Sequence, residues 1–415
     1  MNKIAVIGAG VSGLTVARLM QAKGHSVVVF ERESTVGGLI RCKRVNGSLF
    51  HICGGHVFNS KRQDVLDWFW NYFDKTSEFH LADRKSVVWM QDGLVVPYPI
   101  EDHVYYFNDD IQKRFAHDLD TIERLTSVTP NNFEEFLRMR FGETLYRLYF
   151  EPYNRKVWRR DLSQVPLSWL EGKLPMPTVE QIRYNNQHHV EEKQFVHSTF
   201  YYENNGGSQF LADRLAEGLD IRCNTNIDEI ELRSSGILVN GEQFDKLVFC
   251  GNIKQLIPLL SAIKDLKRYQ SPVNQLESHG TTAVFCELDT NPYTWIYQPS
   301  SAHMSHRIIC TGNFAPSNNA EGKMTGTVEF TDEISESEIR EQLSRMPLHP
   351  RYLTHHYNPY TYPIQDSNTR ALIRDIKKVL APYSIYLTGR FADWEYYNMD
   401  AAMGAAIDLC STFNE

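Results

Sequence analysis

Three glycines near the start of the chain constrain its fold more than any other feature. An apolar run at residues 4–7 leads into Gly8-Ala9-Gly10-Val11-Ser12-Gly13, and an amphipathic stretch continues to Lys23. The first glycine permits a tight turn, the second lets the backbone approach a pyrophosphate, and the third allows a helix to pack closely on a strand. The order of strand, glycine turn and helix therefore predicts the start of a nucleotide-binding sheet.

The next segment indicates which ligand this turn binds. Residues 25–30 predict a second strand, which ends at Glu31, and a carboxylate there can accept hydrogen bonds from a ribose diol. Gly37-Gly38 then allows a second close approach to the ligand. Such a pair is typical of flavoproteins of the amine-oxidase type, and a nicotinamide dehydrogenase does not need it. We therefore expect FAD as the cofactor; a glycine-rich turn without a ligand is the alternative.

Composition and charge argue against several classes of protein. Of the 415 residues, 42% are hydrophobic and 23% are charged, which favours packed globular cores over a disordered chain. The net charge of −8 makes nucleic acid an unexpected partner, because binding it needs a basic surface. No apolar run approaches the roughly 18 residues of a membrane span, so we expect no such span. The first apolar run, residues 4–9, enters the glycine motif instead of a small-residue cleavage site, so we expect no signal peptide.

The cysteines and histidines favour neither disulfides nor a metal site. Seven widely spaced cysteines without a Cys-x-x-Cys pair favour reduced thiols and a cytoplasmic location. His51 and His56 flank Gly54-Gly55 in an apolar setting, but no carboxylate or third ligand lies nearby at the spacing of a metal site. We therefore expect no metal, and we interpret the segment as a histidine loop beside the flavin.

Periodicity divides the remainder of the chain. Helical patterns dominate residues 109–174, where Asn132 is a candidate N-cap and Gly142 a candidate helix end. Strand-like runs return at residues 230–238, and further runs between about residues 281 and 331 predict a separate sheet.

Five blocks together resemble the UDP-galactopyranose mutases, nearer the eukaryotic branch than the common bacterial one. They are the glycine fingerprint with Gly37-Gly38, the Gly54-Gly55-His56 loop, Val96-Pro97-Tyr98-Pro99, residues 151–158, and residues 389–400. The fingerprint is shared by all amine-oxidase-like flavoproteins, whereas the last two blocks are far more discriminating. The blocks are in the family's order along nearly the whole chain.

The resemblance implies an α/β fold. Its parts are a Rossmann-like FAD-binding domain of the amine-oxidase/mutase type, a helical insertion domain and a separate antiparallel β-sheet domain. With the patterns above, it assigns residues 1–85, 203–260 and 375–415 to the FAD-binding domain, 101–175 to the helical domain, and 86–100, 176–202 and 261–374 to the sheet domain.

The resemblance also implies an activity. Members of the family interconvert pyranose and furanose forms of a nucleotide-diphosphate sugar without net redox change. In the implied mechanism, reduced flavin N5 attacks the anomeric carbon and displaces the diphosphate, and the sugar ring then opens and recloses. The resemblance implies reduced FAD as the active cofactor, NADPH or NADH as candidate reductants, and a homo-oligomer as a candidate assembly.

The family's functional positions transfer residue by residue. Arg307 and Arg390 match the arginines that hold the diphosphate, and His56 matches the histidine beside flavin N5; these are the candidate catalytic residues. The candidate substrate-binding residues are Tyr98, Asn154, Trp158, Lys173, His197, Trp295, Tyr297, Tyr362, Tyr396 and Asn398. The candidate cofactor-binding residues are Gly8, Gly10, Ser12, Gly13, Glu31, Arg32, Gly38, Leu39, Gly55, His56, Ile227, Gly389, Arg390, Asn398 and Met399.

Departures from the family pattern leave the substrate open. Lys173 replaces a flap arginine, which keeps the charge but loses bidentate geometry. His197 replaces an asparagine near the sugar, and Glu101 replaces a glutamine near the base. We therefore expect UDP-galactose or a related UDP- or dTDP-hexose.

Two other functions are compatible with the glycine fingerprint. One is an amine-oxidase or protoporphyrinogen-oxidase-like enzyme that passes hydride to oxidised FAD, and the other is a flavin-binding protein without catalysis. An oxidase would not need Arg307, Arg390 and matched tyrosines around a diphosphate. The presence of His56 and both arginines argues against an inactive protein.

Overall fold

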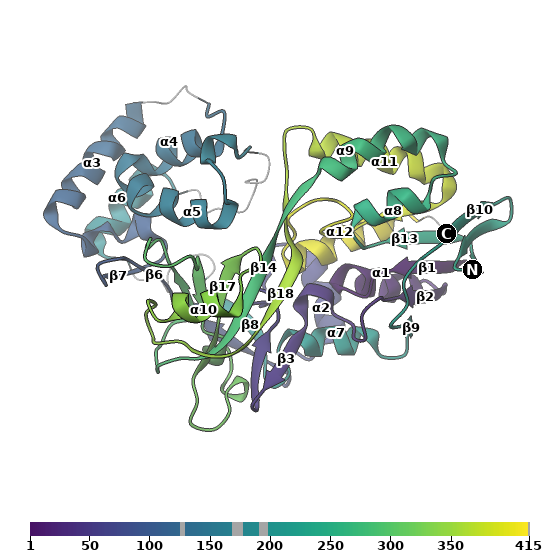
Figure 1. The fold of residues 1–415 in the computed structure, drawn as a ribbon, viewed down its shortest axis with the longest axis horizontal. Helices are drawn as coiled ribbons and strands as arrows, with labels where there is room; N and C mark the ends of the chain where they lie inside the picture. Colours follow the sequence, from purple (N-terminus) through teal and green to yellow (C-terminus); the bar gives the residue numbers. More distant parts are fainter. Residues whose placement is uncertain (125–128, 168–176, 191–197, 414–415) are drawn as a thin grey trace.

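Two β-sheets organise the computed structural model, which describes residues 1–124, 129–167, 177–190 and 198–413. A five-stranded sheet has the strand order β19-β13-β1-β2-β9, and a seven-stranded sheet has the order β18-β14-β17-β16-β15-β6-β7. In Figure 1 the first sheet lies on the right, the second in the lower middle, and a group of helices at the upper left.

The five-stranded sheet is parallel and carries helices on both faces. Its strands are β1 (Lys3–Ile7), β2 (Ser26–Phe30), β9 (Asp220–Arg222), β13 (Lys246–Phe249) and β19 (Ile385–Leu387). One group of helices comprises α1 (Val11–Ala22), α2 (Gln63–Tyr72), α7 (Ser208–Ala216) and α12 (Met399–Ser411). The other comprises α8 (Ile253–Leu259), α9 (Gln270–Gln275) and α11 (Thr369–Leu380). Parallel strands covered on both faces need apolar side chains on both, which explains the apolar run in β1.

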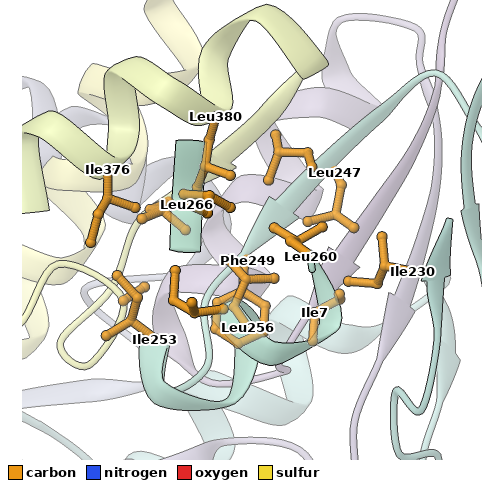
Figure 2. Close-up of a cluster of buried hydrophobic side chains, with 14 of the residues drawn as sticks. Ile7, Ile230, Leu247, Phe249, Ile253, Leu256, Leu260, Leu266, Ile376 and Leu380 are labelled. Carbon is orange, nitrogen blue, oxygen red and sulfur yellow. The ribbon is translucent and has the colours of Figure 1, made fainter. Parts of the chain in front are cut away.

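Alternate residues of β1 enter different cores. Ala5 and Ile7 pack in a cluster with the second group of helices, whereas Ile4 and Val6 pack in a cluster with the first. Figure 2 shows the former cluster, in which Ile253 and Leu256 of α8 approach Phe249 of β13, with Ile376 and Leu380 of α11 nearby. This layering fixes the ends of the parallel strands where the glycine turn emerges.

The seven-stranded sheet holds the expected strands between residues 281 and 331. Its members are β6 (Ser86–Trp89), β7 (Val95–Pro97), β14 (Glu277–Glu287), β15 (Trp295–Tyr297), β16 (Arg307–Ile309), β17 (Thr325–Thr331) and β18 (Arg351–Ile364). All neighbours are antiparallel except β15 and β6, which are parallel. The expected fold class is therefore confirmed, with the correction that this sheet is mixed. Helix α10 (Glu336–Leu343) packs against it.

The helical group comprises α3 (Asp109–Arg124), α4 (Phe133–Leu145), α5 (Glu151–Trp158) and α6 (Val179–His188). Asn132 caps α4 by accepting a hydrogen bond from the Glu135 backbone N–H at 2.9 Å, as expected. Gly142 has φ 77° and breaks the helical path, and a Cβ there would lie 2.5 Å from Cβ of Asp118. Both local signals are thus present in the structure.

Three boundaries differ from the expectation. Helix α6 belongs with the helical group although it lies beyond residue 175, because Ile182 packs in the core of that group. Helix α9 and the start of α11 pack on the parallel sheet rather than in the sheet domain. The strand expected at residues 230–238 is a hairpin of β10 (Ile230–Arg233) and β11 (Gly236–Val239), which continues into β12 (Glu242–Phe244). Gly236, with φ 136°, permits the reversal.

Two further two-stranded sheets complete the fold: β3 (Cys42–Val45) with β4 (Ser48–His51), and β5 (Phe79–Asp83) with β8 (Thr199–Glu203). The seven cysteines are free thiols. Among the residues that the structure describes, no helix has both the length and the hydropathy needed to cross a membrane.

Truncation of Leu256, which is 0% exposed in the cluster of Figure 2, should destabilise the protein by about 2–5 kcal/mol, because it leaves a cavity between α8 and the sheet. The measurement is the free energy of unfolding of Leu256→Ala in urea. Leu81→Ala is the matched control, since Leu81 is 56% exposed and its loss should change stability by no more than about 0.5 kcal/mol. Equal effects of the two substitutions would contradict the packing described here.

Candidate functional site

The turn after β1 requires glycine for its backbone conformation at Gly8 and for close packing at Gly13. Gly8 has φ 103°, and a Cβ on Gly13 would lie 1.9 Å from the Gly8 carbonyl oxygen. Gly37 and Gly38 pack against this turn. The Gly37 N–H donates to the Ala9 carbonyl oxygen at 2.8 Å, and a Cβ on Gly38 would lie 3.2 Å from Cα of Gly10. Backbone N–H groups at the start of α1 are thereby open to an anionic ligand.

These glycines line a cavity of about 510 Å³. All the candidate cofactor-binding residues border it except Gly55 and Gly389. Gly389 is nevertheless adjacent, because a Cβ there would lie 3.2 Å from Oγ of Ser12, whereas Gly55 packs against Ile309 of β16. The volume, the helix N-terminus and the acidic residue at its edge fit a dinucleotide cofactor.

Glu31 is fixed at the end of β2 by backbone donors. Its Oε2 accepts from the Ala9 N–H at 2.7 Å, and its Oε1 accepts from the Glu33 N–H at 2.9 Å. The side chain is 8% exposed and lies on the cavity wall. A carboxylate held in this way still has lone pairs for a ribose diol.

The loop that follows β4 brings His56 to the same cavity. Its Nε2 is buried and has no hydrogen-bond partner among the described residues. Burial, together with the positive charge of Arg390, lowers the pKa of His56 to about 4, so the ring is neutral near pH 7. The Gly54 N–H donates to Oε1 of Glu329 at 2.8 Å, which ties the loop to strand β17.

Glu329 also pairs with Arg307. The two residues lie opposite each other in the β16–β17 ladder, and Nε of Arg307 donates to Oε2 of Glu329. Glu329 is 0% exposed; burial opposes its ionised form, but the charge of Arg307 and a hydrogen bond from His306 hold its pKa well below the usual range. Nη2 of Arg307 donates to the Tyr362 hydroxyl at 2.8 Å.

Arg390 is held by backbone carbonyls. Its Nε donates to the Tyr397 oxygen and its Nη1 to the Thr361 oxygen, each at 3.0 Å. Its guanidinium carbon lies 4.8 Å from the centre of the Tyr396 ring, which stacks on Tyr362 at 5.5 Å. Arg307 and Arg390 therefore flank one tyrosine pair, and the latter arginine also borders the cofactor cavity.

A second aromatic cluster surrounds Tyr297 of β15. The Tyr98 and Tyr153 rings lie 4.9 and 5.6 Å from the Tyr297 ring. Nη2 of Arg84 donates to the Tyr297 hydroxyl at 3.2 Å, and its guanidinium carbon lies 4.7 Å from the centre of the Trp295 ring. Burial raises the pKa of Tyr153, whereas the nearby charge of Arg307 acts in the opposite direction, so this cluster adjoins the arginine–tyrosine group.

Sequence reasoning missed Arg84, Tyr153 and Glu329. Tyr153 lies inside the block at residues 151–158 that carries the family resemblance, and that block is a signal for it. Arg84 lies just before the predicted domain boundary at residue 85. Glu329 lies in a strand pattern that any polar residue could occupy, and only the strand pairing reveals its role.

The remaining candidates differ in placement. Nδ2 of Asn154 donates to the Phe150 oxygen of its own helical segment at 2.7 Å, and Trp158 packs in the core of the helical group. Asn398 and Met399 border the cofactor cavity where α12 begins. Lys173 and His197 lie outside the described residues.

Comparison with known proteins places the chain among flavoenzymes. Residues 11–361 match the family described as flavin containing amine oxidoreductase. The chain belongs to this family. Flavin is the cofactor named by this family, and the cavity bordered by the glycine turn, Glu31 and His56 fits it.

Two relatives of the chain are named as mutases of nucleotide-linked sugars. The chain is 28% identical to a dTDP-fucopyranose mutase of Escherichia coli over 181 residues, which cover 42% of this chain and 46% of that protein. It is 23% identical to a probable UDP-galactopyranose mutase of Klebsiella pneumoniae over 99% of this chain and 94% of that one. A crystal structure of reduced UDP-galactopyranose mutase superposes with a TM-score of 0.87 at 24% identity, over 99% of this chain and 95% of that chain, which shows the shared fold.

The buried state of His56 predicts a pH dependence of stability. The unfolded histidine binds a proton near its ordinary pKa of 6.5, whereas the folded one does so only near pH 4. Unfolding therefore takes up a proton in this window, and stability falls as the pH falls, by about 1.4 kcal/mol per pH unit for each such proton. The free energy of unfolding of His56→Asn in urea, measured between pH 6.5 and 4, should depend on pH less steeply than that of the wild type, by up to one proton. An unchanged slope would show that His56 already titrates normally in the folded chain.

Proposed function

We propose that this chain is a flavin-dependent mutase that interconverts the pyranose and furanose forms of a nucleotide-diphosphate sugar. One observation carries the proposal: Arg307 and Arg390 flank the tyrosine pair of Tyr362 and Tyr396 at the edge of the flavin cavity. Guanidinium groups bind phosphate oxygens through several parallel hydrogen bonds, and tyrosine hydroxyls add further donors. The whole-length similarity to mutases supports the same conclusion.

Three arginines can serve the leaving diphosphate. Arg390 and Arg84 have no carboxylate partner among the described residues, so their charges are available to a ligand. Arg307 is already paired with Glu329, and its role is to donate hydrogen bonds in a fixed direction. All three are held by protein contacts before a ligand arrives, which lowers the reorganisation that the departing diphosphate would require.

The remaining parts of the proposed reaction involve the flavin and residues at the edge of its cavity. When bound in its reduced form, FAD supplies the nucleophile, N5, that attacks the anomeric carbon. His56, neutral at pH 7, presents an unpartnered Nε2 in the cavity region and can take part in a hydrogen bond there. Asn398, next to Tyr397 at the start of α12, borders the cavity, which supports its proposed contact with the sugar.

Glu101 lies beside the aromatic cluster of Tyr297. It is 3% exposed, burial together with Asp102 raises its pKa to about 8, and it acts electrostatically on Tyr98. UDP-galactose and related UDP- or dTDP-hexoses are the proposed substrates, in keeping with the names of the two relatives.

An amine-oxidase or protoporphyrinogen-oxidase-like activity is the competing function, since the same family contains amine oxidoreductases. Such an enzyme passes hydride to oxidised flavin and has no diphosphate to bind. This function therefore gives the arginine–tyrosine group no role. A cytoplasmic location, NADPH or NADH as reductant, and a homo-oligomeric assembly remain predictions.

Incubation of the holoenzyme with UDP-galactose, UDP-galactofuranose and dTDP-hexoses, with and without dithionite, tests the proposal. Chromatography should resolve pyranose and furanose products, and turnover should require reduced flavin. Peroxide release from a non-nucleotide substrate by the oxidised enzyme, without any ring interconversion, would favour the oxidase instead.

Arg390→Ala should lower kcat/KM by about 10²–10³-fold, because it removes a preorganised charge from the leaving diphosphate. Steady-state kinetics with reduced enzyme measure the effect. Arg374→Ala is the control, since the Arg374 side chain on α11 is 66% exposed. Near-wild-type kinetics for Arg390→Ala would remove this residue from the diphosphate site.

A further inference from the structure

His51 is the histidine of the sequence motif to which the proposed reaction gives no role. It is the last residue of β4 and is 0% exposed. Its ring lies 6.1 Å from the His56 ring, 5.9 Å from Tyr202 and 6.1 Å from Phe314. A fully buried imidazole needs hydrogen-bond partners for both nitrogens, and these partners define what the ring does.

The partners fix the position of the ring proton. The His56 backbone N–H can only donate, and it lies 3.3 Å from Nδ1 of His51, so Nδ1 is the acceptor. Ser208 Oγ, 3.2 Å from the same nitrogen, donates its own proton to the Ile40 carbonyl oxygen. Burial lowers the pKa of His51 to about 3, so the ring is neutral and its single proton resides on Nε2. Nε2 then donates to the Tyr202 hydroxyl at 2.8 Å.

The histidine loop is consequently held at two points. Glu329 of β17 accepts from the Gly54 N–H, and His51 of β4 accepts from the His56 N–H. Gly55 lies between the two anchors and packs on Ile309. Tyr202 is itself oriented, since Nδ2 of Asn318 donates to its hydroxyl at 3.0 Å. The backbone at residue 56 therefore depends on a chain of contacts that reaches β8 and the segment after β16.

We propose that His51 is a positioning residue: its Nδ1 holds the His56 main chain, and thereby sets where the His56 side chain lies against the flavin. His51 does not border the flavin cavity and touches no reacting atom. The inference rests on the flavin site and deepens the proposed function, but it does not require a particular sugar.

Two amide substitutions separate the two nitrogens of His51. The amide of asparagine reaches about as far as Nδ1, and that of glutamine about as far as Nε2. His51→Asn keeps an acceptor for the His56 N–H and loses the contact with Tyr202, whereas His51→Gln does the reverse. Both variants lose the ring to the same extent, so each is the control for packing in the other.

The readouts are the visible circular dichroism of bound FAD, its midpoint potential, and the separate values of kcat and KM. His51→Gln should change the flavin spectrum and potential and lower kcat by about 10–100-fold with little change in KM, because displacement of a group by about 1 Å can cost 10²-fold. His51→Asn should remain within about threefold of wild type. Equal effects of the two variants, or none, would overturn the inference.

Tyr202→Phe provides an independent test if His51→Gln does not fold. It removes the hydroxyl that contacts Nε2 but leaves Nδ1 of His51 to accept from the His56 N–H, so the flavin spectrum and potential should stay close to wild type, as in His51→Asn. A clearly shifted flavin spectrum and potential in Tyr202→Phe would then overturn the inference. Because the flavin readouts need no sugar substrate, a protein with these flavin effects but without mutase turnover would contradict the proposed function and leave the role of His51 supported.

Discussion

The carboxylate of Glu329 is the interaction on which the arrangement of the site depends. It is completely buried on β17, and its partners are the Gly54 N–H, Arg307 and His306. An uncompensated buried charge costs several kcal/mol, so the folded chain needs such partners to keep this carboxylate ionised. That requirement joins the loop beside the flavin to the sheet that carries the arginines. The relative position of the His56 loop and Arg307 thus follows from the need to satisfy one carboxylate.

Features encoded within a few residues could be predicted from the sequence. The glycine turn, the second strand ending at Glu31 and the cap at Asn132 each depend on neighbours that lie close in the chain, and the structure contains all three. The sequence pattern indicates one strand where the structure has the hairpin of β10 and β11, since two short strands joined just before Gly236 have the same local pattern as a single longer one. A local sequence pattern does not show where a chain reverses when the turn residues are not distinctive.

Contacts between distant segments determine the rest of the candidate site, and the sequence does not predict these contacts. The Gly54–Glu329 hydrogen bond spans 275 residues, and Arg84 meets Tyr297 across 213. Neither pairing follows from residue type, because glutamate and arginine are common surface residues whose usual partner is water. The resemblance identified Arg307 and Arg390 but not what fixes them, which is one carboxylate for the first and two backbone carbonyls for the second.

That difference between the arginines determines the charge the site can offer. Glu329 balances Arg307, so this pair adds almost no net charge, whereas the carbonyls around Arg390 orient its guanidinium without neutralising it. A diphosphate diester carries two negative charges, and Arg390 alone would leave one of them unmatched. Arg84 lies over the ring of Trp295 without a carboxylate partner in the described chain, and under the proposed function it would supply the second positive charge. Electroneutrality then favours a diphosphate that spans the Arg390 and Arg84 sides of the tyrosine clusters, with Arg307 directing hydrogen bonds between them.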